Sequence, residues 1–562
     1  MGRRLSGVRA TVVAAGLACC VSAPLAHAQG PLPGQPTRDE LNPAARAPAP
    51  APPRSDILEP EPPGPCPLRD SPLKLTLRSV TLRGLTAVPA SDVATAYADL
   101  IGREVPVGAL CDVRDRVAGR LFAAGLLARV EIPEQRIADG ALVLDVIEAR
   151  IVNVRVRGDA GPAQAAVERH LAKLRGMTPF DLNRAQRYLL LAADVPGVAL
   201  RVTVRPSTIQ QRGAVDLDVR VSRDPVDVVV GAQNLGGDAL GPWSAMARAD
   251  FSGFTSLGDR TSLVVFSTVD GDEQRVVQLL EEMRFGGEGL LARANLTYAK
   301  THPGDQFKAL DLEGEALIVG AELVYPVIRS RRQNLNVAVG FDWIDQTTDF
   351  SDLARLTDDK LRVIYARLDG GWRTRTAMPF AVSGALSLRK GLSGFGASDS
   401  NDALLSRFGA DPEATLVRGE LQASLGLAPW VSANLRLEGQ YTDDRLLAYE
   451  EISAGALTVG RGYDPGAATG DRGLMAAFEL RGAPLPLGSG LTLSPYVFVD
   501  AAWLRKLGGA DADLSSAGVG GEVRLGERLR FNLAYAKALE AAYAGAGKPG
   551  GRVLATLTAV LR

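Results

Sequence analysis

Histidine and cysteine are scarce in this chain of 562 residues, which has three histidines and four cysteines. It contains no HExxH pattern and no cysteine cluster, which are common sources of metal ligands. His170 lies among charged residues of a predicted helix, so we expect it on a solvated face. Carboxylates are abundant, but none is paired in a context that indicates acid–base catalysis. We therefore expect no metal, no cofactor and no enzyme activity.

An excess of one charge is also missing, since Lys and Arg total 63 while Asp and Glu total 64. Nucleic-acid-binding surfaces are basic, so we expect no nucleic-acid partner. Beyond the N-terminus there is no run of about 18 uninterrupted apolar residues, which excludes helical membrane spans. A membrane barrel is not excluded, because its strands alternate apolar and polar residues and so have average hydropathy.

Residues 1–28 have the pattern of a secretory signal peptide. Three arginines within the first nine residues precede an apolar stretch at 11–21 and a small-x-small cleavage site that ends at Ala28. A lipoprotein signal at Cys19 or Cys20 fits less well, because the aliphatic residue usual three positions before the cysteine is absent. Cleavage leaves Cys66 and Cys111. In an oxidising compartment these form either a disulfide or two separate thiols.

Residues 29–67 are rich in proline and alanine, which predicts an extended, disordered tether. The only helix-like fragment in it is residues 37–41, and Pro43 is expected to stop that fragment.

Two stretches that follow the tether, residues 68–149 and 150–223, show the same order of strand, helix, helix, strand and strand. The predicted strands of the first are residues 73–84, 128–132 and 141–148, with helices at 90–100 and 107–124. Those of the second are residues 151–157, 198–204 and 214–221, with helices at 163–174 and 182–193. The repetition predicts two tandem α+β modules. Exposed strand edges in such modules can accept an extended polypeptide by strand addition.

Residues 224–562 consist of short alternating segments divided by Gly, Asp, Asn and Pro. One example places Ala433, Leu435 and Leu437 opposite Asn434, Arg436 and Glu438. At about 21 residues per strand and turn, this length gives roughly sixteen strands. A soluble β-sandwich would show the same alternation, but the size favours a closed membrane barrel whose polar face lines water. The fold class is therefore mainly β, a transmembrane antiparallel barrel behind two α+β modules.

One stretch breaks the series of strands: TVGRGYDPGAATGDRG, residues 458–473, with five glycines. Dense glycine lets a backbone fold tightly, and long ordered loops tend to carry function. The alternative is a solvated surface loop.

From about residue 66 to the C-terminus, this architecture resembles the two-partner secretion transporters of the ShlB/FhaC/HecB haemolysin secretion/activation family, within the superfamily that includes BamA. Arg461-Gly462-Tyr463 resembles the Arg-Gly-aromatic tip of the family's long sixth extracellular loop, which folds back into the barrel. Gly470-Asp471-Arg472-Gly473 resembles the start of the next strand. The run from Phe498 through Asp500 to Ala502 resembles the family's aromatic-x-Asp-x-Gly motif on the inner wall, with alanine in place of the final glycine.

The strand pattern supports an inward position for Asp500. Val497, Val499 and Trp503 share one apolar face, so Phe498 and Asp500 point the other way, into the lumen. An arginine that reaches down a lumen needs an anionic anchor, and arginine can bind a carboxylate through two parallel hydrogen bonds. We predict that Arg461 pairs with Asp500. The alternative is two solvated residues that never meet.

The resemblance also has implications for location and partners. It implies an outer-membrane pore in contact with lipid, installed by the barrel assembly machinery, with two polypeptide-transport-associated (POTRA) modules in the periplasm. The partner would be a secreted haemolysin-like or adhesin-like exoprotein, bound unfolded and passed to the cell surface. Many family members carry a cysteine pair in the first module, which implies a Cys66–Cys111 disulfide.

Three further expectations concern what obstructs the pore and which other functions the sequence allows. Family members often begin with a plug helix in the pore, but the tether offers only residues 37–41, so we expect the loop at 458–473 to obstruct the lumen instead. A BamA-like assembly factor is the second hypothesis, although such proteins usually carry more than two modules. A passive porin, the third, has no use for periplasmic modules.

Overall fold

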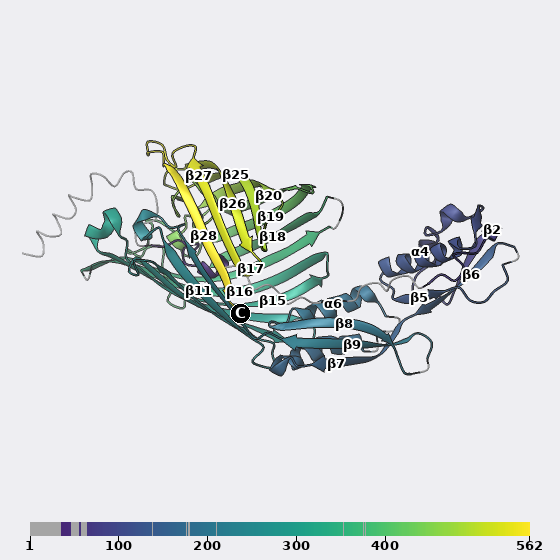
Figure 1. Cartoon of the computed structure of the whole chain (residues 1–562). Coiled ribbons are helices and arrows are strands. Elements are labelled where there is room, and N and C mark those ends of the chain that lie inside the picture. Colours follow the sequence, from purple (N-terminus) through teal and green to yellow (C-terminus); the bar gives the residue numbers. More distant parts are fainter. Residues whose placement is uncertain are drawn as a thin grey trace, which may run out of the picture.

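The computed structural model describes residues 35–46, 56–57, 65–137, 139–175, 177, 180–209, 211–351, 353–374, 376 and 378–561. The predicted signal peptide lies outside the described residues, as do tether residues 29–34, 47–55 and 58–64. Two small modules and a barrel follow one another along the chain (Figure 1). Within the described ranges no helix is long and apolar enough to cross a membrane.

The first module packs helices on a small sheet. Strands β3 (Ser79–Arg83), β6 (Ala141–Glu148) and β5 (Ala128–Glu131) form this sheet in that order, and β2 (Lys74–Thr76) pairs with β4 (Glu104–Pro106). The helices are α3 (Ala90–Ala94), the 3-10 helix η2 (Ala98–Leu100) and α4 (Ala109–Ala123). The core side of α4 consists of fully buried residues at helical spacing: Leu110, Val113, Val117 and Leu121.

The predicted strand 73–84 and helix 90–100 are each divided in two, and β4 is not predicted. A strand of three residues ending in Pro106 is too short to show alternation.

The second module repeats this arrangement. Its elements are β7 (Arg150–Gly158), η3 (Gly161–Ala163), α5 (Gln164–Leu171), η4 (Ala172–Leu174), α6 (Leu182–Ala193), β8 (Val198–Pro206) and β9 (Ala214–Arg223). The sheet order is β1-β8-β9-β7, and β1 is Asp56–Ile57 of the tether, paired in parallel with Arg201 and Val202. The tether prediction misses this strand, because backbone pairing at a sheet edge needs no side-chain pattern.

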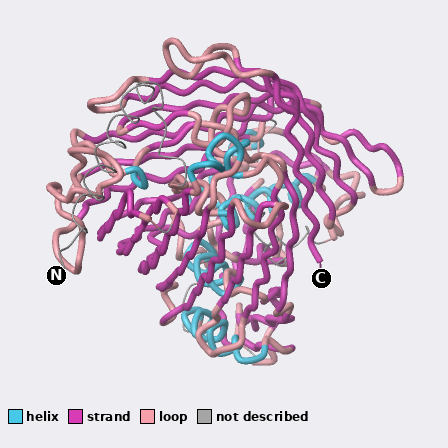
Figure 2. The backbone as a smooth tube through the Cα atoms, turned by 90° about the vertical axis from the view of Figure 1, so that its left-hand side faces the viewer, coloured by secondary structure: helices cyan, strands magenta, loops and turns pink. Residues whose placement is uncertain are grey.

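The remainder of the chain is a closed antiparallel barrel, whose curved wall is evident in Figure 2. Seventeen labelled strands form it, but β23 and β24 both pair with β25 and share one position, so the predicted sixteen is confirmed. Closure comes from β10 and β28, paired from Val228 with Leu561 to Gln233 with Thr556. The strands are β10 (Val226–Gln233), β11 (Ser244–Ser252), β12 (Arg260–Thr268), β13 (Gln274–Phe285), β14 (Leu290–Thr301), β15 (Leu312–Arg329), β16 (Gln333–Phe350), β17 (Ala354–Arg373), β18 (Phe380–Gly391), β19 (Thr415–Ala428), β20 (Val431–Thr442), β23 (Arg472–Gly482), β24 (Leu485–Gly488), β25 (Leu491–Arg505), β26 (Ala512–Leu525), β27 (Leu529–Ala538) and β28 (Gly551–Leu561).

The outward face of the barrel is apolar and uncovered. On β25, Val499 is 51% exposed, while the adjacent Phe498 and Asp500 are 3% and 2% exposed. A soluble sandwich would bury the apolar face of such a strand, so this pattern favours the membrane barrel over the sandwich. Asp500 faces the lumen, as the strand pattern predicts.

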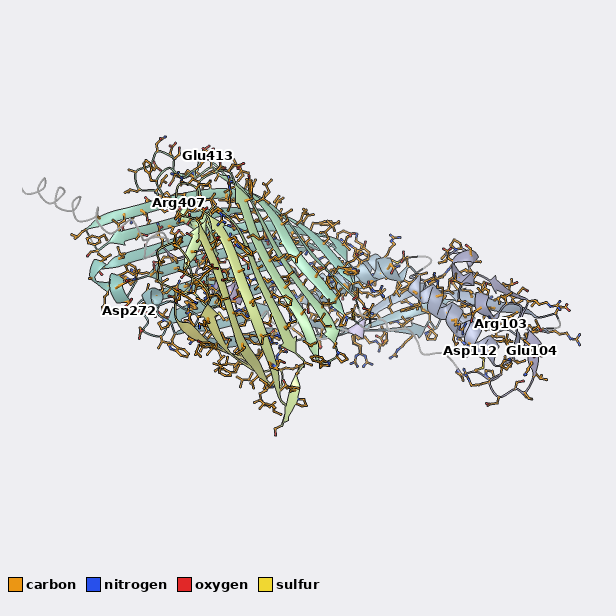
Figure 3. All side chains as sticks on the ribbon, turned by 90° about the horizontal axis from the view of Figure 1, so that it is seen from above. Arg103, Glu104, Asp112, Asp272, Arg407 and Glu413 are labelled. Carbon is orange, nitrogen blue, oxygen red and sulfur yellow. A yellow bond between two sulfur atoms is a disulfide. The ribbon has the colours of Figure 1, made fainter. Side chains whose placement is uncertain are left out.

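The two ends of the barrel differ. The modules join the end at which β10 begins, which we call the module end. The long loops lie at the opposite, loop end, where Figure 3 labels Arg407 and Asp272, far from Arg103 and Asp112 of the first module. Short 3-10 helices occur in these loops at Asp238–Leu240 (η5), Asp305–Leu310 (η6) and Ala448–Glu450 (η7).

The second module packs closely on turns at the module end. A Cβ atom added at Gly258 would lie 2.9 Å from the Cβ of Ala166, so only glycine permits this approach. At the C-terminus of α6, the Asp194 carboxylate accepts two hydrogen bonds from Arg329, of 2.6 and 2.7 Å. The module is therefore fastened to the barrel by both packing and charge.

His170 belongs to the same contact, and the predicted solvated position is wrong. Its side chain is 1% exposed, and its Nδ1 lies 3.1 Å from the carbonyl oxygen of Gly287. Glu168 and Arg169, which precede His170 on α5, are charged and indicate a solvated position, but a barrel turn distant in the sequence covers the ring. Burial lowers the pKa of His170, so the ring stays neutral and donates to that carbonyl.

Candidate functional site

The loop between β20 and β23, residues 443–471, folds into the barrel. Most of it is buried, from Leu446 through Ala456 and again from Ala468 to Asp471. A small hairpin of β21 (Ile452–Ala454) and β22 (Ala468–Gly470) forms its stem. This burial excludes the solvated surface loop considered as the alternative.

Glycines shape the tip of this loop. Gly455 and Gly460 have φ angles of +149° and +120°, which side-chain-bearing residues rarely adopt. Gly462 meets the wall instead: an added Cβ would lie 2.6 Å from the backbone nitrogen of Ala538 and 2.8 Å from the Cβ of Ser516. The tip therefore touches β26 and β27 directly.

Arg461 binds the carboxylate of Asp500, and the structure thus brings the predicted pair together. Its Nη2 and Nε donate to the two carboxylate oxygens at 2.7 and 3.0 Å, and its backbone nitrogen donates at 2.9 Å. Its Cζ lies 3.4 Å from the ring centroid of Phe498, a cation–π contact. Phe498 of the predicted wall motif therefore forms a platform for the guanidinium.

In the Arg461–Asp500 pair, the carboxylate is shielded from solvent and the guanidinium is partly exposed. The Asp500 side chain is fully buried, whereas that of Arg461 is 22% exposed. Two further residues complete the site, since Arg461 also contacts Glu479 at 3.2 Å and the Ser516 hydroxyl donates to Asp500 at 3.3 Å. The sequence pattern identifies neither, although the parity of Glu479 on β23 points it inward.

Tyr463 is held by its hydroxyl group. This oxygen lies 2.9 Å from the carbonyl oxygen of Ser515 and 2.8 Å from that of Glu540, and it accepts from the Ser515 nitrogen at 3.3 Å. The side chain is 1% exposed. The tyrosine at the aromatic position of the motif thus makes hydrogen bonds that phenylalanine could not make.

The motif at residues 470–473 lies where the loop returns to the wall. Asp471 is fully buried and accepts two hydrogen bonds from Arg407, of 2.6 and 3.2 Å. It also accepts from the backbone nitrogens of Leu446 and Leu507, each at 2.7 Å. One carboxylate therefore joins three loops.

The neighbours of Asp471 have simpler roles. Arg472 pairs with Asp443 at 2.7 Å. Gly470 and Gly473 permit close approach, because an added Cβ would lie 3.0 Å from the Arg505 carbonyl oxygen and 2.5 Å from the Leu504 side chain respectively.

A second segment, residues 35–46, also lies inside the barrel, and we call it the lumen segment. It contacts inward-facing side chains of the wall: the Gln35 amide donates to Thr357 at 2.6 Å, and Gln346 donates to the Pro36 carbonyl at 3.0 Å. Gln278 donates to the Leu41 carbonyl at 3.3 Å and accepts from the Ala44 nitrogen at 2.9 Å. The prediction of a disordered tether is wrong for these residues.

The local structure of the lumen segment also differs from expectation. Thr37 and Glu40 cap each other, with Glu40 accepting from the Thr37 nitrogen at 2.8 Å, so residues 37–41 form a turn. The α-helix α2 is Pro43–Arg46. Pro43 begins this helix rather than stopping one, since a first-turn proline sacrifices no helical hydrogen bond. A plug-like segment is thus present beside the loop.

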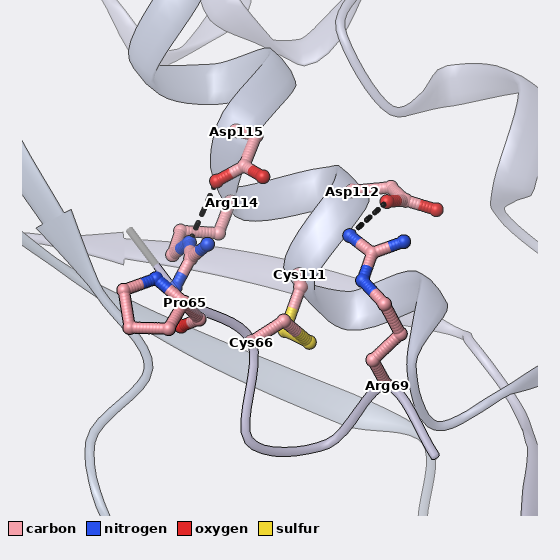
Figure 4. Close-up of a disulfide and its surroundings, with 7 residues drawn as sticks. All are labelled: Pro65, Cys66, Arg69, Cys111, Asp112, Arg114 and Asp115. Atoms are coloured by element: carbon pink, nitrogen blue, oxygen red, sulfur yellow. Dashed lines mark hydrogen bonds and ion pairs between the residues drawn. A yellow bond between two sulfur atoms is a disulfide. The ribbon is translucent and has the colours of Figure 1, made fainter. Parts of the chain in front are cut away.

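Cys66 and Cys111 form a disulfide with a Cα–Cα distance of 5.9 Å, as the resemblance implies (Figure 4). Cys111 is buried in the first turn of α4, and Cys66 lies on the approach to β2. Arg69 and Asp112 form an ion pair of 3.6 Å beside it. The bond fastens the end of the tether to the first module.

Comparison with known proteins decides the family. Residues 213–525 match the haemolysin secretion/activation protein ShlB/FhaC/HecB family, and residues 75–149 match the ShlB-type POTRA domain. The chain belongs to the ShlB/FhaC/HecB family. This is a family of outer-membrane secretion transporters, not a class of enzymes. The barrel accordingly lies in the outer membrane, with the module end and the POTRA modules in the periplasm and the loop end outside.

Individual relatives are distant. The heme/hemopexin transporter protein HuxB of Haemophilus influenzae is 22% identical over 433 residues, which cover 76% of each chain. Among solved structures, CdiB from Escherichia coli matches with a TM-score of 0.67 and 15% identity, covering 87% of this chain and 91% of that one. BamA from Haemophilus ducreyi lacking POTRA domains 1–3 matches with a TM-score of 0.51 and 14% identity, covering 86% of this chain and 99% of that one. The structural likenesses show a shared fold.

Proposed function

We propose that this transporter binds an unfolded secreted protein in the periplasm through its POTRA modules and passes it through the barrel to the cell surface. The edge of β8 carries the proposal, because it already accepts an extended peptide. Asp56 and Ile57 of the chain itself pair with Arg201 and Val202 there. Strand addition binds backbone groups, which suits a substrate that has no fold.

The contents of the lumen support a gated pore rather than a passive porin. Both the loop at 443–471 and the lumen segment lie inside the wall without belonging to its hydrogen-bonded ladder. Either can therefore move while the sixteen-strand ring stays closed. A secreted chain would replace these elements during passage, and the polar inner wall would supply partners for its backbone.

Deletion of the gene tests the function against the assembly-factor alternative. We expect the culture medium to lose one secreted protein while other outer-membrane barrels keep their normal amounts, as measured by quantitative mass spectrometry of both fractions. A general decrease of barrel proteins would instead identify a BamA-like assembly factor. Re-expression of the wild-type chain should restore secretion.

Photo-crosslinking tests the binding mode. A photoreactive residue at Arg201, on the side of β8 that only Asp56 and Ile57 cover in the part of the chain that the structure describes, should form adducts with the secreted protein when it replaces them during export. Arg220, its partner on the central strand β9, is the matched control, because β9 is paired on both sides and offers no free edge. Equal adducts at both positions, or none at Arg201, would contradict strand addition at this edge.

A further inference from the structure

A cavity of about 790 Å³ lies at the module end of the lumen, beneath the tip of the loop. Its charged lining is almost entirely basic, with six arginines and a single glutamate: Arg329, Arg331, Arg332, Arg373, Arg436, Arg461 and Glu479. The whole chain has 63 basic and 64 acidic residues, so this excess is local. Three of the arginines, Arg329, Arg436 and Arg461, are each paired with a carboxylate outside the lining.

The cavity lies between the second module and the loop. On the module side, Arg329 pairs with Asp194 of α6, and the backbone nitrogen of Arg331 donates to Gln186 of the same helix at 3.2 Å. On the other side, its lining includes Arg461 at the loop tip. A polypeptide that leaves the second module for the loop end would therefore cross this cavity first.

The single carboxylate in the lining is already neutralised. Glu479 contacts Arg461 at 3.2 Å and Arg481 at 2.9 Å. Arg332 and Arg373, by contrast, are exposed at the rim formed by the 330–332 turn and the end of β17. A cleft lined by one sign of charge concentrates ligands of the opposite sign.

The uncharged part of the lining suits an extended backbone. It includes amide and hydroxyl side chains, which both donate and accept hydrogen bonds: Ser330, Gln333, Asn334, Ser383, Gln422 and Asn434. Such groups bind peptide units without regard to sequence, while the arginines select for carboxylates.

From this geometry we infer that the cavity is a binding site for acidic, extended segments of the secreted protein, which it receives from the second module before the loop moves. This inference rests on the proposed translocation function and adds a substrate preference to it. Acidic stretches dwell in the cavity, and basic stretches are repelled.

The test uses the full-length protein in detergent and a fluorescent oligoglutamate peptide, with binding followed by anisotropy. We expect oligoglutamate to bind at least tenfold more tightly than oligolysine or oligoserine of the same length, and to weaken steeply with added salt. The double variant Arg332→Gln with Arg373→Gln should weaken binding about tenfold. Arg332→Lys with Arg373→Lys should retain most of it, and Arg103→Gln, in the first module, should have no effect.

Equal binding of the three peptides, or unchanged binding by the Arg332→Gln, Arg373→Gln variant, would overturn the inference. An equal loss with Arg103→Gln would also overturn it, since binding would then reflect general surface charge. These results are separate from the secretion test: a transporter that exports its partner but ignores oligoglutamate retains the proposed function and loses only this site.

Discussion

Among the residues that the structure describes, the loop at 443–471 and the lumen segment both occupy the lumen, and they are held in different ways. The loop at 443–471 is fastened to β25 by the Arg461–Asp500 pair and to neighbouring loops by Asp471. The lumen segment reaches the opposite wall through the amide side chains of Gln278 and Gln346. The loop is held mainly by buried ion pairs, whereas the lumen segment is held by neutral hydrogen bonds, by the packing of Leu41 and by a cation–π contact of Arg46 with Phe266.

This difference implies different resistance to displacement. Breaking a buried ion pair by removing one partner typically costs about 3–5 kcal/mol, because the remaining charge has no compensation. A neutral hydrogen bond contributes a net of about 1 kcal/mol. We therefore expect the lumen segment to leave the pore more readily than the loop.

The largest effect is expected at Arg461. Arg461→Ala leaves the buried Asp500 carboxylate with the Ser516 hydroxyl and the backbone nitrogen of residue 461 but no cation, so we expect secretion to fall at least tenfold. Arg461→Lys keeps the charge without the paired hydrogen bonds and should be intermediate. The measurement is the amount of secreted protein per unit of folded transporter in the outer membrane.

Arg481→Ala is the matched control for that prediction. Arg481 also pairs with Glu479 in the lumen, but its side chain is 30% exposed and it does not carry the loop. We expect near-normal secretion from it. If both alanine variants lost secretion equally, the loop would owe its function to lumen charge in general rather than to its anchor.

A smaller effect is expected at the base of the loop. Asp471→Asn keeps the shape but removes the charge that binds Arg407, which should lower the free energy of unfolding by about 2–3 kcal/mol. The readout is the temperature at which the folded barrel unfolds in gel-shift electrophoresis. Asp443→Asn, which weakens the exposed pair with Arg472, should change stability by less than about 1 kcal/mol. Equal shifts in the two variants would mean that the three-loop contact adds no stability.

The effect expected for the lumen segment is on conductance. Gln278→Ala with Gln346→Ala removes three neutral hydrogen bonds, worth about 3 kcal/mol together, so the open pore should become at least tenfold more populated. Single-channel recording of the full chain in planar bilayers measures this. Asn336→Ala, at an inward residue bonded to Asp369, is the control. If the double variant conducted no more than the control, the loop rather than the segment would close the pore.

Much of the fold follows from local pattern. The order strand, helix, helix, strand and strand in both modules, without β1 and β4, comes from residue spacing, and the sixteen strands come from the length of the barrel region. The inward side of Asp500 also follows from spacing, because alternate residues of a strand face opposite sides. Predicting the Arg461–Asp500 contact and the Cys66–Cys111 bond required the family resemblance in addition to the residue pattern. Strand parity places Glu479 and Ser516 on the inward face, but no motif distinguishes them from the other inward residues.

Other features have no local signature. Pro43 can stop a helix or begin one, and only the wall that surrounds residues 35–46 decides which. His170 looks solvated on its own helix, yet a barrel turn covers it. The partner of Asp471 is Arg407, which lies in a loop that precedes β19.

By itself, the sequence determined the periodic parts of this transporter: two α+β modules, a polar-lined barrel and a glycine-rich loop with an inward carboxylate opposite. The tertiary structure alone decided what fills the lumen and how firmly, and it alone assembled the arginine-lined cavity at the module end. The reason is physical. Alternation is a property of neighbouring residues, whereas closing a barrel joins side chains hundreds of residues apart, and burial and pairing depend on that closure.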